Sequence, residues 1–371
     1  MIRLENLTKH FGAPSDPIVA VDNVSLEVPT GEICVLLGPS GCGKTTTMKM
    51  INRLIQPTSG KVFIDGRDTS EVDPIQLRRS IGYVIQQIGL FPNKTIEDNI
   101  CIVPDLLGWD RAKSRARARE LLGLAGLEPD LFLRRYPAEL SGGQQQRVGV
   151  LRALAADPPV MLMDEPFGAI DPINREVIQD EFLKLQREMR KTVIFVSHDL
   201  DEAVKMADKI AIFRSGKLEQ YASPDELLAH PASPFIENFL GTDRALKRLR
   251  LVSVDCAMAK DFVCATPETA PAELCQRLKG ARVPAALVVN ADGVAEAIID
   301  GERARQAHAA LADLAEPVRA TVPVTADVRQ AVSLMLAHDM PVLPCTDEAG
   351  KVCGVVTFRS IVDSLRGGGE P

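Results

Sequence analysis

The chain has 371 residues, more than one ordinary hydrophobic core accommodates, so we expect two or more domains. Its apolar fraction of 46% and charged fraction of 25% argue against a disordered or fibrous protein. The net charge of −7 implies no general affinity for nucleic acid. No stretch approaches the roughly 20 apolar residues that cross a bilayer, and Met1–His10 lacks the apolar core of a secretory signal. We therefore expect a cytosolic chain that would reach a membrane only by docking onto another protein.

Short apolar segments stand out in the first part of the chain, and longer helical patterns separate them. The segments are Ile33–Leu37, Val160–Met163 and Thr192–Val196. Near-continuous apolar runs of this length are typical of parallel strands that helices bury on both faces. Ala112–Leu122 and Arg175–Met189 have the charged, amphipathic pattern of such helices. The sequence therefore predicts an α/β domain over residues 1–241 with a parallel central sheet.

The composition changes after about Leu240, where the chain becomes rich in Ala, Val and Pro. We interpret residues 242–252 as a basic, helix-prone linker and residues 366–371 as a disordered tail. Between them lie two weakly similar halves, at 253–307 and 313–365. Two pairs of segments carry the similarity: Val283–Asn290 with Met340–Thr346, and Val294–Asp300 with Lys351–Thr357. This pattern predicts a tandem repeat of one small α/β unit.

One segment matches the phosphate-binding pattern G-x-x-x-x-G-K-[ST]: Gly38–Thr45, with the letters GPSGCGKT. It follows Ile33–Leu37 and opens a predicted helix at Thr45–Leu54, which is the context that the pattern requires. The glycines let backbone N–H groups wrap phosphates at a helix N-terminus, while Lys44 would reach the β- and γ-phosphates and Thr45 would bind Mg²⁺. The expected ATP-binding residues of this loop are Gly38, Pro39, Ser40, Gly41, Cys42, Gly43, Lys44, Thr45 and Thr46. A glycine-rich turn without a ligand is the alternative.

Two carboxylates end an apolar run, Val160–Glu165, which reads VMLMDE. Asp164 would hold Mg²⁺ through water, and Glu165 would orient and polarise the attacking water. Without a phosphate loop in the chain, paired acids after a strand would indicate a helix cap or a solvated edge. Together with that loop, they favour hydrolysis of a nucleoside triphosphate.

A third segment resembles the signature motif of ABC ATPases: Leu140–Gln144, which reads LSGGQ. Its residues are Leu140, Ser141, Gly142, Gly143 and Gln144. At the start of a helix they would offer N–H donors and a positive dipole end to an anion, although a plain helix cap is the alternative. In that family the signature of one subunit closes over the γ-phosphate bound by the other. The resemblance therefore implies a head-to-tail homodimer around two ATP molecules, with a helical subdomain at about 88–155 in each cassette.

Four single residues match further positions of the ABC ATPase pattern. Phe11 resembles the aromatic residue that stacks on adenine, with a core position as the alternative. Gln86, in IGYVIQQIGLFP, resembles the glutamine that contacts Mg²⁺ and the permease, and Gln87 is its neighbour. Asp171, in GAIDP, matches the loop that crosses the dimer interface, and His198, in FVSHD, matches the switch histidine at the γ-phosphate.

Longer stretches resemble the ATPases of glycine betaine, carnitine and choline importers. They read IGYVIQQIGLFPNKTIEDNI, MDEPFGAIDPINR and GTDRALKRL. The resemblance implies a separate integral membrane permease, indirectly a substrate-binding protein, and no nucleic acid partner. It also implies a peripheral location on the cytoplasmic face of the bacterial inner membrane. The alternatives are an importer ATPase for another small solute and an ABC ATPase outside transport.

The second C-terminal half resembles a CBS repeat, and the first half resembles a more degenerate copy of it. Repeats that bind adenine nucleotides place an Asp three residues after a Thr, whereas here Ser360 follows Thr357, and Asp300 of the first half lacks the Thr. A small regulatory ligand such as a nucleotide or cyclic dinucleotide, anionic lipid sensed through basic residues, and no ligand all stay open. The basic cluster is Arg244, Lys247, Arg248 and Arg250.

Overall fold

The computed structural model describes residues 1–13, 15–85, 89–168, 170–265, 269–281, 283–306 and 311–366. The chain divides into two compact units, residues 1–241 and 242–371. Each unit has sheets and cores of its own. Among the described residues, no helix combines the length and the apolar character that a bilayer crossing requires.

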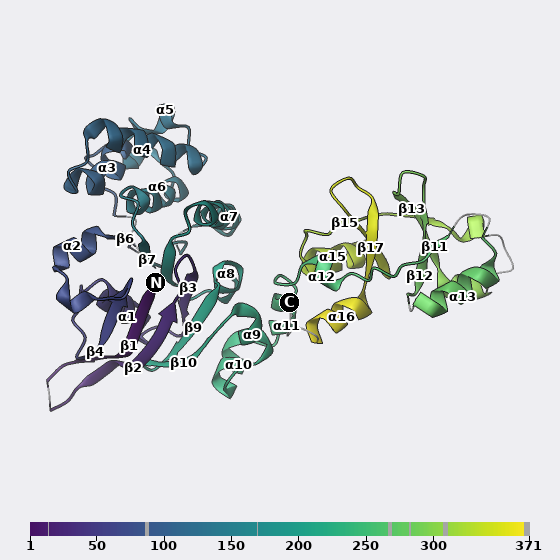
Figure 1. Cartoon of the computed structure of the whole chain (residues 1–371), viewed down its shortest axis with the longest axis horizontal. Coiled ribbons are helices and arrows are strands. Elements are labelled where there is room, and N and C mark those ends of the chain that lie inside the picture. Colours follow the sequence, from purple (N-terminus) through teal and green to yellow (C-terminus); the bar gives the residue numbers. More distant parts are fainter. Residues whose placement is uncertain are drawn as a thin grey trace. The chain divides into compact units, whose positions relative to one another are not determined.

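The first unit is built on a six-stranded sheet with the order β10-β9-β3-β8-β7-β6 (Figure 1). Its strands are β3 (Ile33–Leu37), β6 (Ile81–Val84), β7 (Val160–Asp164), β8 (Thr192–Val196), β9 (Lys209–Arg214) and β10 (Lys217–Ala222). All neighbours are parallel except β10, which pairs antiparallel with β9 at one edge. Every residue of β3, β7 and β8 is buried, so both faces of these strands are covered. The predicted α/β fold with a parallel central sheet is therefore confirmed.

A second, antiparallel sheet has the order β2-β1-β4-β5. Its strands are β1 (Ile2–Phe11), β2 (Ile18–Val28), β4 (Ser59–Ile64) and β5 (Arg67–Asp68). The helix after the phosphate loop, α1 (Lys44–Ile51), contributes Met48, Met50 and Ile51 to a core cluster that joins both sheets. This helix ends before the predicted Leu54, because the chain turns into the left-handed region at Arg53 (φ 48°). The phosphate loop is thus anchored on both of its sides by buried elements.

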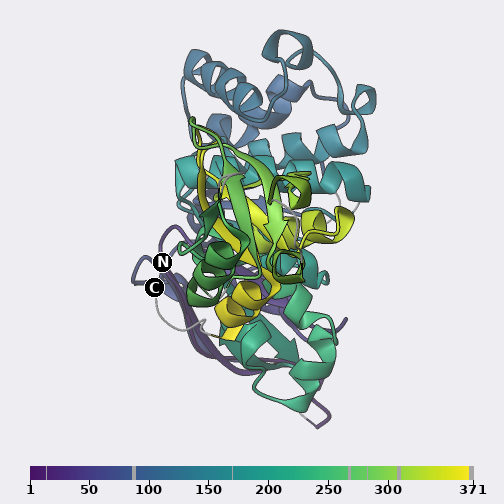
Figure 2. The ribbon, with the colours of Figure 1, turned by 90° about the vertical axis from the view of Figure 1, so that its right-hand side faces the viewer.

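A group of helices between β6 and β7 forms a separate part of this unit, away from the strands β1 and β2 (Figures 1 and 2). They are α3 (Ile96–Leu106), α4 (Arg111–Leu124), α5 (Pro129–Phe132) and α6 (Gly142–Leu154). Side-chain oxygens of Thr95, Asp110 and Ser141 accept hydrogen bonds from first-turn N–H groups, so each of these residues caps its helix. The remaining helices of the unit are α2 (Pro74–Arg79), α7 (Pro172–Met189), α8 (Leu200–Met206), α9 (Pro224–Ala229) and α10 (Pro234–Leu240).

The second unit repeats one order of elements twice. The first copy is β11 (Cys264–Ala265), α13 (Pro271–Ala281), β12 (Ala285–Val289), β13 (Ala295–Asp300) and α14 (Gly301–Gln306). The second copy is β15 (Val322–Pro323), α15 (Val328–Ala337), β16 (Val342–Thr346), β17 (Val352–Thr357) and α16 (Phe358–Arg366). In both copies the first strand runs parallel to the second, and the third runs antiparallel to it. The short elements outside this order are α11 (Arg244–Arg248), α12 (Val254–Ala257), the 3-10 helix η3 (Leu311–Leu314) and β14 (Glu316–Pro317).

The two halves of this unit exchange short segments. Helix α12 precedes the first half, yet Val254 and Ala257 lie in the core of the second half, and the Val254 N–H donates to the Ala326 carbonyl at 2.9 Å. Conversely, β14 precedes the second half in sequence but pairs with β13 of the first. Because each half borrows an element from beside the other, the two halves form one body.

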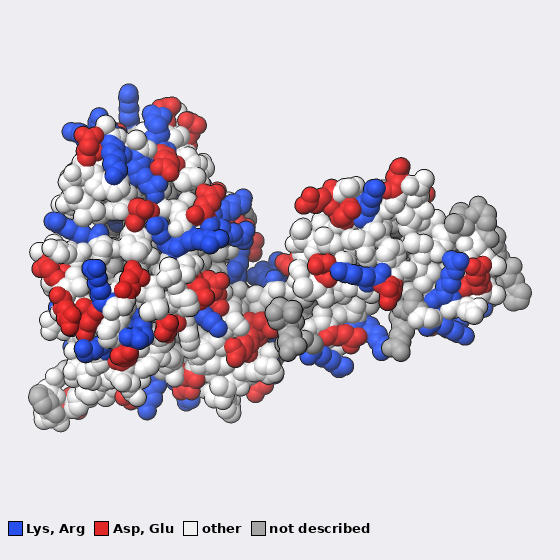
Figure 3. Space-filling view, in the orientation of Figure 1, with Lys and Arg blue, Asp and Glu red and all other residues white. Residues whose placement is uncertain are grey.

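Figure 3 shows lysines and arginines interspersed with aspartates and glutamates on the visible face of both units. On this face, therefore, the charged side chains form mixed patches, and neither sign is gathered into one large field.

Candidate functional site

The phosphate loop opens onto a cavity of about 480 Å³ in the first unit. The loop lies between β3 and α1, where the strand ends and the helix N-terminus points its free N–H groups outward. The lining residues are Ala20, Ser40, Gly41, Cys42, Gly43, Lys44, Thr45, Thr46, Glu165, Val196 and His198. The structure therefore brings most of the predicted loop residues into one cavity with Glu165 and His198.

Two loop glycines are required by close backbone contacts as well as by their dihedral angles. Gly38 has φ 144°, and a Cβ atom there would lie 2.3 Å from the Phe213 carbonyl oxygen. Gly43 has φ 104°, and a Cβ atom there would lie 2.4 Å from the Ala20 carbonyl oxygen. A side chain at either position would push the loop away from its neighbouring strands, so glycine is needed for the loop to curl.

Lys44 is 7% exposed and points back into its own loop. Its Nζ atom donates to the carbonyl oxygens of Gly38 at 2.6 Å and Pro39 at 2.9 Å. These two acceptors fix the ammonium group beside the phosphate-loop cavity, which Lys44 lines. The position of this charge is thus set by carbonyl groups of its own loop.

Thr45 and Asp164 bring two oxygen ligands together at the junction of α1 and β7. The Thr45 hydroxyl donates to Asp164 Oδ1 at 3.3 Å. Burial raises the pKa of the Asp164 carboxyl, the hydrogen bond from Thr45 opposes that shift, and the charge of Glu165 adds to it. Mg²⁺ takes one or two protein oxygens and completes its shell with phosphate and water, so this pair fits such an ion.

Glu165 follows β7 in a strained backbone conformation, with φ 47°. Its N–H donates to the Val196 carbonyl at 3.0 Å, which ties it to the end of the neighbouring strand β8. The Nδ1 atom of His198 lies 3.5 Å from Glu165 Oε1. Left-handed backbone at a non-glycine residue costs of order 1–3 kcal/mol and is found at functional sites. The Glu165 carboxylate and the His198 imidazole lie side by side where they line the phosphate-loop cavity.

The LSGGQ segment lines a different cavity, of about 660 Å³. Ser141 caps α6: the Gln144 N–H donates to Ser141 Oγ at 3.3 Å, and the Ser141 N–H donates to Gln144 Oε1 at 3.0 Å. Asp171 lines the same cavity, together with Gly142 and Gly143. Leu140 is buried and anchors the segment. Within one chain, then, the signature segment and the phosphate loop face separate cavities.

Comparison with known proteins decides the family. A family model for the ABC transporter matches residues 21–168, and a model for the CBS domain matches residues 312–367. The osmoprotectant import ATP-binding protein OsmV of Salmonella typhimurium is 52% identical over 99% of this chain and 97% of its own length. The chain belongs to the ABC transporter family. Its predicted family and its activity as an ABC-type ATPase are thereby confirmed.

Other relatives of this ABC protein agree with that result. The glycine betaine/carnitine/choline transport ATP-binding protein OpuCA of Bacillus subtilis is 46% identical over 98% of the chain and 96% of its own length. The dimeric structure of MJ0796, a bacterial ABC transporter cassette, is 38% identical with a TM-score of 0.55, and it covers 60% of this chain and 98% of that one. The cassette structure covers a share of the chain about as large as the first unit, whereas the named transport proteins match nearly the whole chain and so both units.

The hairpin of β1 and β2 carries one predicted residue of the ABC cassette, Phe11. Phe11 ends β1 with 40% of its surface exposed, does not line the cavity, and lies under the Lys9 ammonium at 5.1 Å. It belongs to the same hairpin as Ala20, which does line the cavity and which the sequence analysis missed. Gln86 falls outside the described residues. No local motif distinguishes Ala20, since it lines the cavity only through the pairing of β1 with β2.

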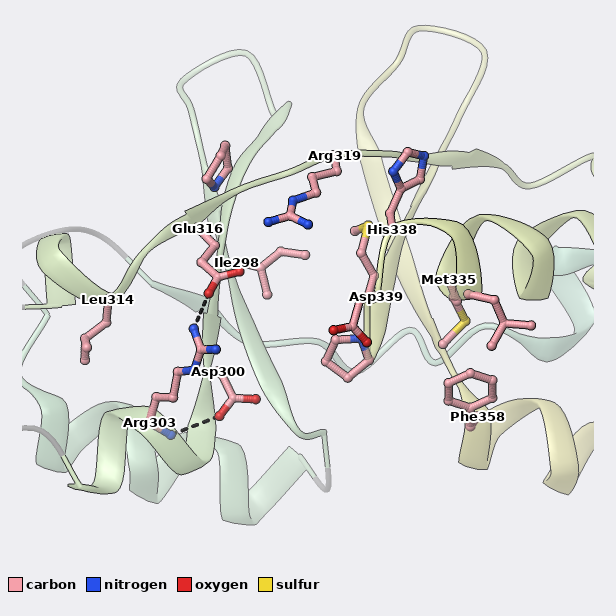
Figure 4. A pocket seen from close by; sticks show the side chains of 14 residues that line it. Ile298, Asp300, Arg303, Leu314, Glu316, Arg319, Met335, His338, Asp339 and Phe358 are labelled. Atoms are coloured by element: carbon pink, nitrogen blue, oxygen red, sulfur yellow. Dashed lines mark hydrogen bonds and ion pairs between the residues drawn. The ribbon is translucent and has the colours of Figure 1, made fainter.

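The second unit of the ABC protein holds a cleft of about 540 Å³ between its two halves (Figure 4). The lining residues named in Figure 4 are Ile298, Asp300, Arg303, Leu314, Glu316, Arg319, Met335, His338, Asp339 and Phe358. Arg303 forms an ion pair with Glu316 across the wall of the first half. Arg319 points into the space between the halves, with no hydrogen bond or ion pair to the described residues. The cleft therefore holds one guanidinium whose charge is available to a ligand.

Thr357 with Ser360 in the second half, and Asp300 in the first half, act as helix caps here. Ser360 N–H donates to Thr357 Oγ1, and Thr357 N–H donates to Ser360 Oγ, each at 3.0 Å. Asp300 Oδ1 accepts from the N–H groups of Glu302 at 2.8 Å and Arg303 at 2.9 Å. Both side chains thus stabilise the start of a helix, α16 and α14 respectively.

Proposed function

We propose that this chain is the ATP-hydrolysing subunit of an importer for quaternary ammonium osmoprotectants such as glycine betaine, proline betaine, carnitine or choline. The supporting observation is similarity over both units to proteins named for osmoprotectant import and for glycine betaine, carnitine and choline transport. Because relatives named for different solutes all match nearly the whole chain, the similarity supports the solute class rather than one member of it. The runner-up is an importer ATPase for another small solute.

The residues of the phosphate-loop cavity suit the hydrolysis of ATP. Lys44 would bind the β- and γ-phosphates, and the loop N–H groups would surround them. Glu165 would accept a proton from the attacking water, and His198 beside it would contact the γ-phosphate. Thr45 and Asp164, with Gln86 of the glutamine loop, would hold Mg²⁺, which when bound neutralises charge on the phosphate oxygens. Phe11 would pack against the adenine ring.

The complete site would need two chains. The phosphate loop and the signature segment line separate cavities of one chain, so a single chain does not close both over the same γ-phosphate. A head-to-tail homodimer would set Ser141 and Gly143 of one subunit against the phosphate loop of the other, with Asp171 at the interface. The related cassette MJ0796 is described as dimeric, which supports this arrangement. ATP would then hold the dimer closed, and hydrolysis would release it.

The partners follow from this role. An integral membrane permease would carry the solute, and a substrate-binding protein would select it and deliver it. The chain would be a peripheral subunit on the cytoplasmic face of the bacterial inner membrane.

The cleft of the second unit would bind a small regulatory ligand between a degenerate first CBS repeat and the second. Its volume of about 540 Å³ suits a molecule of nucleotide size. Arg319 would pair with an anionic group of that ligand. Because the ribose-binding position is a helix cap here, the ligand would be held differently from a conventional adenosine nucleotide.

Glu165→Gln tests the catalytic assignment directly. The amide keeps the size of the side chain but does not accept a proton, so we expect ATP turnover to fall by about 100-fold to 10,000-fold. ATP binding should persist, and the variant should elute as a stable dimer in the presence of ATP and Mg²⁺. Size-exclusion chromatography and phosphate release measure these two results. Near-normal turnover by the variant would remove Glu165 from the role of general base.

A further inference from the structure

A buried carboxyl group lies behind the candidate active site, in a position that the proposed chemistry does not use. Glu202 is 7% exposed and sits in the first turn of α8. It does not line the phosphate-loop cavity, so it would not touch the nucleotide. It shares a small internal space with the two residues at the mouth of that cavity, Glu165 and His198, and with Ser197, Asp199 and Arg175.

Both oxygens of Glu202 are engaged. Gln179 Nε2, from α7, donates to Glu202 Oε1 at 3.1 Å. The hydroxyl of Ser197 donates to Glu202 Oε2. Ser197 Oγ in turn accepts from the Asp199 N–H at 3.0 Å. The two residues that flank His198 are therefore fixed to each other and to Glu202.

A second arm of contacts runs from the same loop to the segment before Asp171. Asp199 Oδ1 caps α8 through the N–H groups of Asp201 at 2.9 Å and Glu202 at 3.2 Å. Its other oxygen, Oδ2, lies 3.3 Å from Arg175 Nη1. Arg175 Nη2 donates to the Ile170 carbonyl at 3.0 Å. Ile170 directly precedes Asp171, so a chain of polar contacts joins the histidine loop to the loop of Asp171.

Burying the Glu202 carboxyl group costs free energy of folding, because its ionised form is better solvated by water. Burial raises the pKa of Glu202 above its ordinary value, and the hydrogen bond from Ser197 opposes that shift. An unpaired buried charge would be strongly destabilising, but here each oxygen has a donor. A satisfied buried polar network fixes one arrangement of the chain more sharply than apolar packing does, because a shifted loop would leave its members unpaired.

We propose that Glu202 is a positioning residue for ATP hydrolysis, which holds the Ser197–His198–Asp199 loop so that the imidazole stays beside Glu165. This inference rests on the proposed role of His198 and goes beyond it. The contacts of Arg175 with Asp199 and with the Ile170 carbonyl would also fix the loop of Asp171, at the expected dimer interface. The network would thus set the histidine and the interface loop in one geometry.

Glu202→Ala in the full-length chain tests the proposal. Displacement of a reacting group by about 1 Å can cost about 100-fold in rate, so we expect kcat for ATP to fall by tenfold to about 100-fold. The Kd for ATP should stay within about twofold, since the phosphate loop is untouched. Glu202→Gln should restore most of the rate, because its amide can accept from Gln179 and donate to Ser197.

Lys205→Ala is the matched control. Lys205 also joins α8 to α7, through Asp180 at 2.8 Å and the Glu176 carbonyl at 3.2 Å, without contacting the histidine loop. It should keep a near-normal kcat at a temperature well below its Tm. A normal kcat in Glu202→Ala, an equal loss in Lys205→Ala, or no rescue by Glu202→Gln would each overturn the proposal. If His198→Ala also hydrolyses ATP normally, the proposed role of the histidine itself has failed.

Discussion

The buried carboxyl group of Asp164 is expected to help bind a cation and, without one, to lower the stability of the fold. It lies at the buried end of β7, next to the second acidic side chain, Glu165. Burial raises its pKa, and the neighbouring carboxylate adds to the shift. Above the raised pKa the ionised group therefore lowers the stability of the chain in the absence of a cation. The same negative charge is what a magnesium ion would require.

Asp164→Asn should stabilise the first unit when Mg²⁺ and nucleotide are absent. The amide removes the buried charge and keeps an oxygen for the Thr45 hydroxyl, so we expect its Tm at pH 7 to rise by about 2 °C. A carboxyl group with a raised pKa opposes folding only when it is ionised. The gain should therefore shrink as the pH falls through that pKa, because the Asp164 carboxyl becomes neutral in the parent protein as well.

Calorimetric unfolding in EDTA at two values, pH 7 and the lowest pH at which the parent chain stays folded, measures this difference. Asp16→Asn, at an exposed position, is the control and should leave the Tm unchanged at both values. A lower Tm in Asp164→Asn at pH 7, or a difference that grows as the pH falls, would contradict the expected burial effect.

At the residue scale, local patterns predicted most of the loop residues that line the phosphate-loop cavity, because a phosphate loop needs its glycines, lysine and threonine at fixed spacing. The same patterns did not identify Glu202 or Arg175. Their partners are Gln179 and Ser197 for the first, and Asp199 and Ile170 for the second. These contacts depend on how α7 and α8 pack beside the strand ends, and no short motif in the sequence encodes that packing.

At the scale of helices and strands, the predicted boundaries agree with the structure for the buried strands and differ for α7. Strands β3, β7 and β8 follow the predicted apolar runs closely, because a strand buried on both faces has an unbroken apolar sequence. Helix α7 starts at Pro172, three residues before the predicted Arg175. Proline suits the first turn of a helix, where its missing N–H is not needed, so Pro172 was the signal that could have set this boundary.

Several elements together form the cleft between the repeats, among them β13, α15 and α16. We expect titration calorimetry of the full-length chain to detect an adenine nucleotide or a cyclic dinucleotide in it, with Lys44→Ala as the background that weakens the ATP site. Arg319→Ala should lower the affinity at least about tenfold, the effect of losing one charge-assisted contact of roughly 1.5–3 kcal/mol.

Arg359→Ala serves as the matched control for that titration. Arg359 is also an exposed arginine of the second unit, but it pairs with Asp363 along α16 and does not line the cleft. It should bind the nucleotide as the parent does. Absence of heat with both nucleotides in the parent chain, or equal binding by Arg319→Ala, would count against the proposed ligand site.

At the scale of the whole molecule, the sequence predicted a repeat of one small α/β fold but not the exchange of segments between its halves. Helix α12 packs in the core of the second half, and β14 pairs with β13 of the first half. Such non-local pairing leaves no periodic signal in the chain. The similarity to named osmoprotectant, carnitine and choline transport proteins runs through both units. The repeat unit is therefore a regular part of such ABC proteins rather than an unrelated attachment.

Uptake of labelled glycine betaine at high external salt tests the central claim most directly. Cells that lack this chain and have no other uptake system for the solute would receive either the native chain or Lys44→Ala. The substitution removes the ammonium group that Gly38 and Pro39 hold at the phosphate loop, and it leaves the remaining surface of the chain intact. We expect the native chain alone to restore uptake. Equal uptake in the empty strain and in both complemented strains would contradict the proposal that this ATPase drives osmoprotectant import.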